Sequence, residues 1–308
     1  MNEAKKLIAA TLIVFALGGT CLAQPAEQSE DPLPVPSALQ LTVGAGYEET
    51  FRSDIDSGGD FSITSANFDI SLSTILFDDM KFTLTYQYIM DEYDFGGTTG
   101  LGGLNPWDDV ESHYVSLIAS KQLANDWTVF GGPIAQFARD RDARLGDSDT
   151  YGGMVGLSIN HSETLTYGGG LGVITSLEES ERLFPIIILN WQIKPDLRLA
   201  TDTDAGRSGA ELIYSVNEGF DIALGLAYEF KRFRLDDASF APAGVAENTS
   251  LPAWVRMTFQ LDNNLTVNLR AGMRFGGRLK IDNSIGNQLR DEDYDPVLFV
   301  GATLSLHF

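Results

Sequence analysis

The sequence predicts an all-β protein, a closed antiparallel β-barrel that crosses a lipid bilayer with its strands. Apolar residues recur at every second position over stretches of strand length. Tight turns alternate with longer polar segments along the chain. Beyond the N-terminal region, no apolar stretch is long enough to form a membrane-spanning helix. These three observations are typical of a barrel in which only alternate residues face lipid.

The last twelve residues (297–308) contain the clearest of these alternating strands. Its apolar positions are Leu298, Val300, Ala302, Leu304, Leu306 and Phe308. A period of two places them on one face of a strand, and that face ends on an aromatic residue. The segment resembles the C-terminal assembly signal of bacterial outer-membrane β-barrels, with Leu304, Leu306 and Phe308 at its apolar positions. This resemblance implies a protein that the barrel-assembly machinery inserts among outer-membrane lipid and lipopolysaccharide.

The N-terminal residues 1–23 are typical of a cleaved secretory signal peptide. Two lysines precede an apolar run at residues 7–19, and small residues precede Gln24. An acylated lipoprotein would instead use Cys21, the single cysteine, but the residues before it lack the pattern of such sites. Cleavage after Ala23 would leave a chain with neither disulfide nor thiolate chemistry.

The remaining chain divides into a short lead-in and one barrel. Residues 24–37 are rich in proline and acidic residues, which predicts a disordered periplasmic segment. From 38 to 308 strand patterns recur without a domain break, and counting them gives 14 strands, or 12 if the hairpin at 197–216 is absent. A change of parity within residues 61–76 predicts a bulge near Ser65.

The connections alternate in length, which predicts short periplasmic turns and longer extracellular loops. The turns are expected at 78–79, 124–126, 162–163, 194–196, 217–219 and 262–264. The longer segments lie at 52–60, 92–110, 139–149, 177–183, 202–209, 235–249 and 282–296. Aromatic residues on the apolar register near the turns predict a periplasmic aromatic belt. They are Phe82, Trp127, Trp191, Phe220, Phe259 and Phe308.

Composition and the spacing of reactive residues exclude several functions. The net charge is -22 and the mean hydropathy -0.05, and no basic stripe exists to bind nucleic acid. Ser112 and His113 are adjacent and therefore point to opposite faces of a strand, so they are poorly placed as nucleophile and base. The acidic residues around 147–149 lack the spacing of a calcium loop. We predict no catalytic residue, no cofactor and no metal site, and hence no enzyme.

The candidate functional residues are charged and lie on the inward register. Arg256, Arg270 and Arg274 alternate with lipid-facing apolar residues, and the turn at 262–264 makes Arg256 and Arg270 near cross-strand partners. Like charges in opposition are destabilising, so carboxylate partners are expected. The candidates are Glu229, Glu211, Asp221 and, across the barrel, Asp69. The set is either a network that braces the wall or a basic strip facing acidic groups at a constriction, similar to the eyelet of general porins.

The predicted function is passive passage of small hydrophilic solutes through the outer membrane. Strand spacing and tilt give such a barrel a radius of about 14 Å, which exceeds what side chains alone fill. Inward glycines indicate lumen space, barrel curvature or the approach of a loop. They include Gly44, Gly46, Gly152, Gly156, Gly168, Gly170 and Gly172. The alternative is a non-conducting structural or surface-binding barrel, and the oligomeric state stays undetermined.

Overall fold

The computed structural model describes residues 39–308 except 78, 124–125 and 205, so the expected signal peptide and lead-in lie outside the described residues. The strands are β1 (Gln40–Asp54), β2 (Asp60–Leu76), β3 (Met80–Gly96), β4 (Asp109–Gln122), β5 (Trp127–Asp140), β6 (Asp149–Ser162), β7 (Leu165–Ser176), β8 (Glu179–Lys194), β9 (Leu197–Asp204), β10 (Arg207–Asn217), β11 (Phe220–Arg234), β12 (Val245–Gln260), β13 (Leu265–Asp282), β14 (Gln288–Tyr294) and β15 (Val297–His307). The described helices are α2 (Gly100–Leu104) and the 3₁₀ helix η1 (Leu145–Asp147). Neither is long and apolar enough to cross a membrane.

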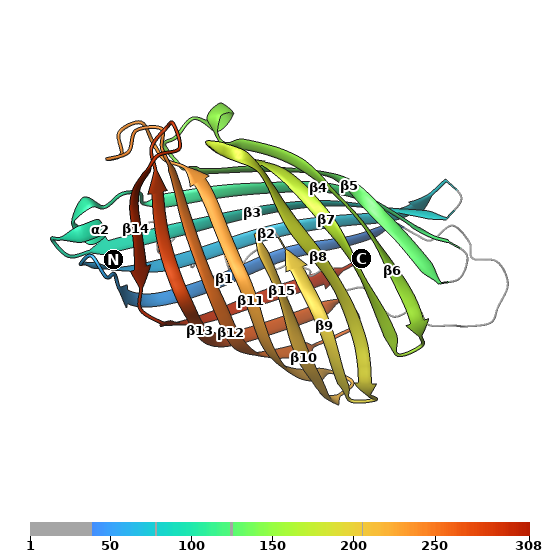
Figure 1. Cartoon of the computed structure of the whole chain (residues 1–308). Helices are drawn as coiled ribbons and strands as arrows, with labels where there is room; N and C mark the ends of the chain where they lie inside the picture. The colour runs from blue at the N-terminus through green and yellow to red at the C-terminus, as the bar shows by residue number, and fades with distance from the viewer. Residues whose placement is uncertain (1–38, 78, 124–125, 205) are drawn as a thin grey trace.

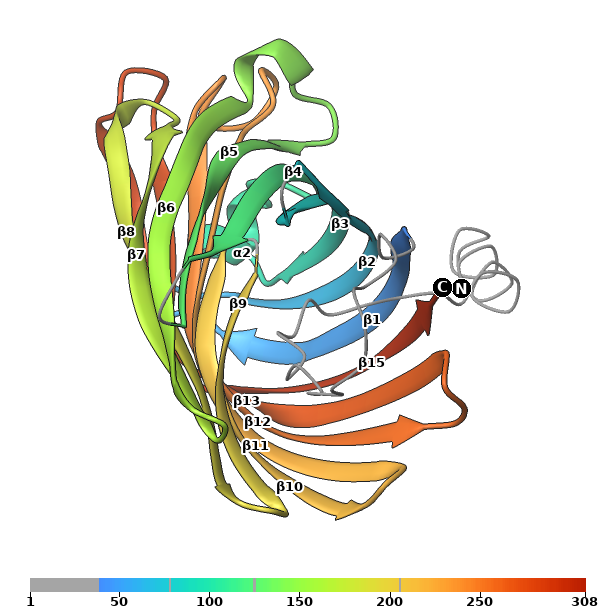
Figure 2. The ribbon, with the colours of Figure 1, turned by 90° about the vertical axis from the view of Figure 1, so that its right-hand side faces the viewer.

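The strands form one antiparallel sheet that closes on itself (Figures 1 and 2). Each strand from β1 to β13 pairs with the next one in sequence, and β15 pairs with both β13 and β1. β13 pairs with β15 over Leu265–Arg274 and with β14 over Gly277–Asp282. β14 and β15 are therefore two halves of one strand, interrupted at residues 295–296, and the barrel has the predicted 14 strands.

The outward register of the barrel is apolar and exposed. Leu171, Leu183, Ile187 and Leu224 are each more than half exposed. Water-soluble monomers do not expose apolar side chains around a whole sheet, whereas a barrel in lipid must do so. Trp127, Trp191 and Phe308 are exposed near one end of the strands, as the predicted aromatic belt requires. The protein is an outer-membrane β-barrel.

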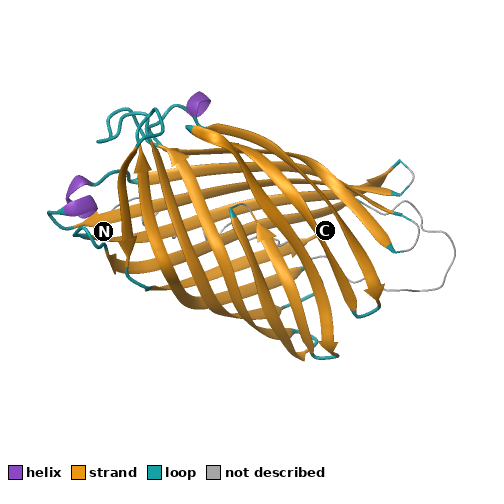
Figure 3. Ribbon diagram, viewed as in Figure 1, coloured by secondary structure: helices purple, strands orange, loops and turns teal. Residues whose placement is uncertain are grey.

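The two ends of the barrel differ in their connections (Figure 3). The predicted tight turns all join strands at one end, called here the turn end, which also carries both termini of the barrel. The opposite, loop end carries the segments 97–108 and 235–244, and it is extracellular in a barrel of this class. Two predicted long loops are wrong. β7 ends at Ser176 and β8 begins at Glu179, while β9 ends at Asp204 and β10 begins at Arg207, because polar residues there continue the strands.

An apolar cluster fills the interior of the barrel towards the loop end. Its members are Ile55, Phe61, Ile63, Tyr93, Leu101, Trp107, Val110, Ala138, Phe233, Leu235, Ala241, Ala246, Leu279, Ile281, Tyr294 and Val297. Phe61 and Ile63 point inward there, whereas Phe68 further along β2 is exposed on the outside. This explains the change of parity near Ser65. The predicted bulge is wrong, since β2 pairs with β3 without interruption from Asp60 to Leu76.

Candidate functional site: the charged layer of the barrel interior

The inward arginines meet near the middle of the barrel, and we call them and their carboxylate partners the charged layer. Arg256 on β12 lies directly opposite Arg270 on β13, as the sequence predicts. The two guanidinium groups turn to opposite sides. Arg256 donates from Nε to Glu211 Oε1 at 3.0 Å, while Arg270 forms an ion pair of 2.6 Å with Glu48 on β1. Each of these two guanidinium groups thereby has a carboxylate partner, Glu211 for Arg256 and Glu48 for Arg270.

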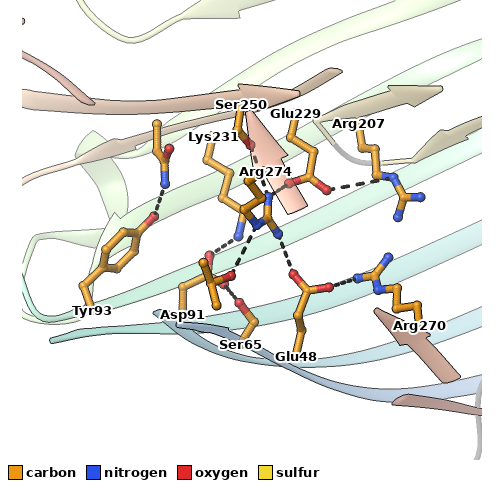
Figure 4. A network of polar contacts seen from close by, with 12 residues as sticks. Glu48, Ser65, Asp91, Tyr93, Arg207, Glu229, Lys231, Ser250, Arg270 and Arg274 are labelled. Atoms are coloured by element: carbon orange, nitrogen blue, oxygen red, sulfur yellow. Dashed lines mark hydrogen bonds and ion pairs between the residues drawn. The ribbon is translucent and has the colours of Figure 1, made fainter. Parts of the chain in front are cut away.

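Arg274 connects two further carboxylates (Figure 4). Its guanidinium pairs with Glu229 on β11 through one terminal nitrogen and with Glu48 through the other. It also donates to Ser250 Oγ at 3.2 Å. The side chain is 9% exposed, compared with 25% for Arg270. Arg274 is therefore a buried link within the wall, whereas Arg270 faces the interior.

Trp254 and Arg207 complete the layer on the side of β10. The Trp254 indole donates from Nε1 to Glu211 at 2.8 Å, and the Arg207 guanidinium lies over its ring, 4.3 Å from the ring centre. Arg207 also approaches Glu229 to 3.9 Å. The indole ring lies across Gly225 of β11, where a Cβ would collide with it. Four guanidinium groups and the carboxylates of Glu48, Glu211 and Glu229 meet in this layer.

A second polar contact crosses the interior next to the apolar cluster. Lys231 on β11 reaches Asp91 on β3 at 2.6 Å, although these strands are not neighbours in the sheet. Asp91 is almost fully buried and also accepts a hydrogen bond from Ser65. Nearby, Asn248 donates to the Tyr93 hydroxyl at 3.1 Å. These contacts and the apolar cluster together close the barrel axis at the loop end.

A small cavity remains beside this contact. It measures about 30 Å³ and is lined by residues that include Gln87, Asp91, Tyr114, Gln136 and Lys231. One water molecule needs a cavity volume of roughly 10–15 Å³, so this cavity has room for water but is too small for an organic solute.

Towards the turn end the interior is lined by hydroxyl and amide groups. Ser71 and Ser73 of β2 lie at 3.4 and 2.9 Å from the hydroxyls of Thr85 and Thr83 on β3. Across the barrel, Asn268 donates to Thr303 at 3.2 Å. This half of the interior has the polar character of a water-filled barrel lumen.

The structure brings some of the candidate residues together and separates others. Glu211 and Glu229 lie in the charged layer with the three arginines. Asp221 lies nearer the turn end, opposite Ser215 on β10 and Thr258 on β12. Asp69 lies over Gly44 in the wall between β1 and β2.

Three important members of the polar network are absent from the sequence prediction: Glu48, Arg207 and Lys231. Glu48 had a usable signal, because it lies on the inward register of the first strand, which a closed barrel places near the last strands. Arg207 begins a strand that was predicted as part of a loop, so its register was hidden.

The inward glycines accommodate neighbouring side chains. The Phe130 ring lies over Gly156 and the Phe184 ring over Gly172, each on the adjacent strand, at positions where a Cβ would collide with the ring. Such pairs of an aromatic residue with glycine fill the space left by the missing side chain. At these two glycines another group does approach the backbone closely, but it is an aromatic side chain of the adjacent strand and not the loop that was one of the expectations.

The sequence matches no family model and no curated protein. Solved structures with a similar fold are outer-membrane barrels. An outer-membrane channel from Pseudomonas putida F1 has 10% identity and a TM-score of 0.49, covering 92% of this chain and 100% of that chain. A FadL homologue from Pseudomonas aeruginosa has 12% identity and a TM-score of 0.42, covering 87% and 89%. Pseudomonas putida OprB has 11% identity and a TM-score of 0.40, covering 88% and 94%. These values concern the fold alone.

Proposed function

We propose that this protein is a passive outer-membrane channel for small hydrophilic solutes. The observation that carries the proposal is the polar lining of the barrel, which runs from the turn end up to the charged layer. A lumen lined in this way holds water and offers hydrogen bonds to a passing solute. The barrel radius expected for 14 strands, about 14 Å, leaves room for such a lumen.

The charged layer would act as the selectivity element of this channel. The guanidinium groups of its lumen-facing arginines attract anions when the anions are close enough to escape screening by salt. Arg256 and Arg270 are 17% and 25% exposed and can influence ions in the lumen, whereas Arg274 at 9% braces the wall. The bracing and selectivity interpretations therefore apply to different arginines.

The direct test is single-channel recording of the purified protein in a planar bilayer. Discrete conductance steps whose reversal potential in a salt gradient changes on Arg270→Ala support the channel. If the conductance steps of Arg270→Ala keep the wild-type selectivity, the charged layer only stabilises the wall.

A non-conducting structural or surface-binding barrel is the second candidate. It is favoured by the apolar cluster and the Lys231–Asp91 ion pair, which close the axis at the loop end. Absence of conductance in the wild type and in all variants would support this candidate.

A further inference from the structure

The barrel wall is incomplete between β8 and β11 in its loop-end half. Among the described residues, β8 pairs with β9 only from Asn190 to Lys194. At the next position the Leu189 N–H donates to the Thr201 hydroxyl at 2.9 Å, in place of a ladder bond. β10 begins at Arg207 opposite Glu229, so β11 continues beyond the tip of the β9–β10 hairpin. Figure 1 shows β9 and β10 ending well before the loop end, while β8 and β11 continue.

The loop-end half of β11 stays paired with β12 up to Arg234, and its end comes beside β5. Arg234 pairs with Arg139 of β5, which is not a neighbour of β11 elsewhere in the barrel. Lys231 pairs with Asp91, and Phe233 belongs to the apolar cluster. The alternate residues Arg232 and Arg234 contact the turn between β7 and β8. β11 therefore separates the filled axis from the sheet formed by β6, β7 and β8.

Side chains close this boundary between β8 and β11, which we call the seam. The Arg182 guanidinium stacks on the Phe230 ring, 3.3 Å from the ring centre. Arg232 donates to the Leu177 carbonyl at 2.7 Å, and Arg234 pairs with Glu178 at 2.6 Å. A barrel wall in lipid is normally closed by a continuous backbone ladder, because unpaired strand edges are costly there. Side-chain contacts exchange far more readily than a ladder, so the seam is the weakest part of the loop-end wall.

We propose that solutes pass along the seam between β8 and β11 and reach the polar lumen without crossing the filled axis. This inference rests on the proposed channel function and deepens it by giving the path and the preferred solute. The path bypasses both the apolar cluster and the Lys231–Asp91 contact, which explains how a barrel with a closed axis can conduct.

The seam selects water-soluble anions that carry an apolar or aromatic body. Arg182 supplies a guanidinium group that binds an anionic oxygen pair, and Phe230 supplies a ring face for an apolar body. Ile186 lies four residues after Arg182, on the same face of β8. It is buried and extends the apolar surface from Arg182 along the strand. A solute of this kind replaces the Arg182–Phe230 stack with contacts to both residues, whereas a sugar has no charge to pair with the guanidinium and a cation is repelled by it.

Locking the seam tests the path. The double variant Arg182→Cys/Phe230→Cys removes the stack, and a bifunctional methanethiosulfonate long enough to replace the two side chains then joins β8 to β11. The natural Cys21 lies in the expected signal peptide and does not interfere. The matched control is Ala253→Cys/Met273→Cys, directly opposite each other in the paired wall of β12 and β13.

The readout is efflux of labelled benzenesulfonate from proteoliposomes. Crosslinking the seam is expected to lower efflux about tenfold, and a reductant to restore it, because gating at a constriction controls flux. The control crosslink should leave efflux unchanged. If the crosslinked seam variant shows efflux at the wild-type rate, the proposed path is wrong but the channel function is not contradicted. Absence of efflux from wild-type vesicles for every solute would overturn the channel and the path together.

Solutes of fixed charge test the selectivity. Benzenesulfonate should leave wild-type vesicles several times faster than benzyltrimethylammonium or glucose, owing to its contacts with Arg182 and Phe230. Arg182→Gln should remove this preference. Arg198→Gln on β9, the same change outside the seam, should retain it. Loss of preference in both variants, or its absence from the wild type, would overturn the assignment of the seam as the selective site.

Discussion

Glu48 and Arg270 form an ion pair over the backbone of Gly301. Glu48 on β1 and Arg270 on β13 both lie opposite Gly301 in the intervening strand β15, and their Oε2 and terminal nitrogen atoms are 2.6 Å apart. Because Gly301 has no side chain, the two long side chains meet across it. The pair ties the first strand to a late one at the closure of the barrel.

A side chain at position 301 should therefore weaken this closure. In Gly301→Val the new Cβ would lie 3.1 Å from the Tyr47 carbonyl oxygen and 3.3 Å from Arg270, so the ion pair must shift. We expect a loss of about 1–3 kcal/mol in the free energy of unfolding, measured by urea titration of the refolded barrel. Gly146→Val, where nothing lies within 4 Å of the new Cβ, is the control and should behave as the wild type. Equal stability of the two variants would contradict the role of the pair.

The arginines of the charged layer should separate into two groups. Arg256→Ala and Arg270→Ala should shift the reversal potential towards cations, because each removes a positive charge that faces the lumen, and the shift should weaken at higher salt. Glu229→Gln should shift it towards anions. Arg274→Ala leaves Glu48 and Glu229 short of a buried partner, so it should cost about 3–5 kcal/mol of stability, seen as a lower temperature of the heat-induced gel shift. Unchanged selectivity in the first two variants would argue for bracing throughout.

The two ends of the chain should control maturation and assembly. Outer-membrane fractionation followed by N-terminal sequencing should show a mature chain that begins at Gln24. Deletion of Phe308 should reduce the amount of folded barrel in the membrane, because its backbone pairs with Leu41 of the first strand and its ring lies in the aromatic belt. Recovery of a soluble periplasmic monomer would contradict the membrane assignment.

The loop end should face the outside of the cell. Cysteines placed at Asp147 in η1 or at Asp293 in β14 should react with an impermeant maleimide in intact cells, because both positions lie at the loop end. A cysteine at Glu163, in the turn between β6 and β7, is the control and should react only after permeabilisation. The reverse pattern would invert the topology. The acidic loops around these positions would present a negative mouth that divalent ions bridge to lipopolysaccharide.

The sequence predicted the parts of the fold that depend on local periodicity. The alternation in β12, β13 and β15 was read correctly, and it placed Arg256 opposite Arg270 because one tight turn sets that register. The apolar cluster was missed because an apolar residue on alternate positions was taken to face lipid. At Phe61 and Ile63 the same pattern faces the interior.

Contacts that cross the interior could not be predicted from periodicity. Lys231 and Asp91 are 140 residues apart, and their strands are not paired, so no local register relates them. The seam was also hidden, because the charged stretch before Phe184 suggested a loop where β8 in fact begins. Glu48 could have been predicted from the sequence, because closure of the barrel places β1 and β13 on the two sides of β15, with Glu48 and Arg270 both opposite Gly301.

The interruption of the final strand at residues 295–296 has a consequence for the order in which the molecule assembles. β15 pairs with β1 and with the turn-end part of β13, whereas β14 pairs with the loop-end part of β13, and of the β15 residues only Val297 belongs to the apolar cluster. We therefore expect that the ring can close at the turn end before the loop-end interior is packed. Pro296, which has no N–H to donate, lies at the interruption between the two halves of the strand. We expect insertion and final compaction to be separable events in the maturation of this barrel.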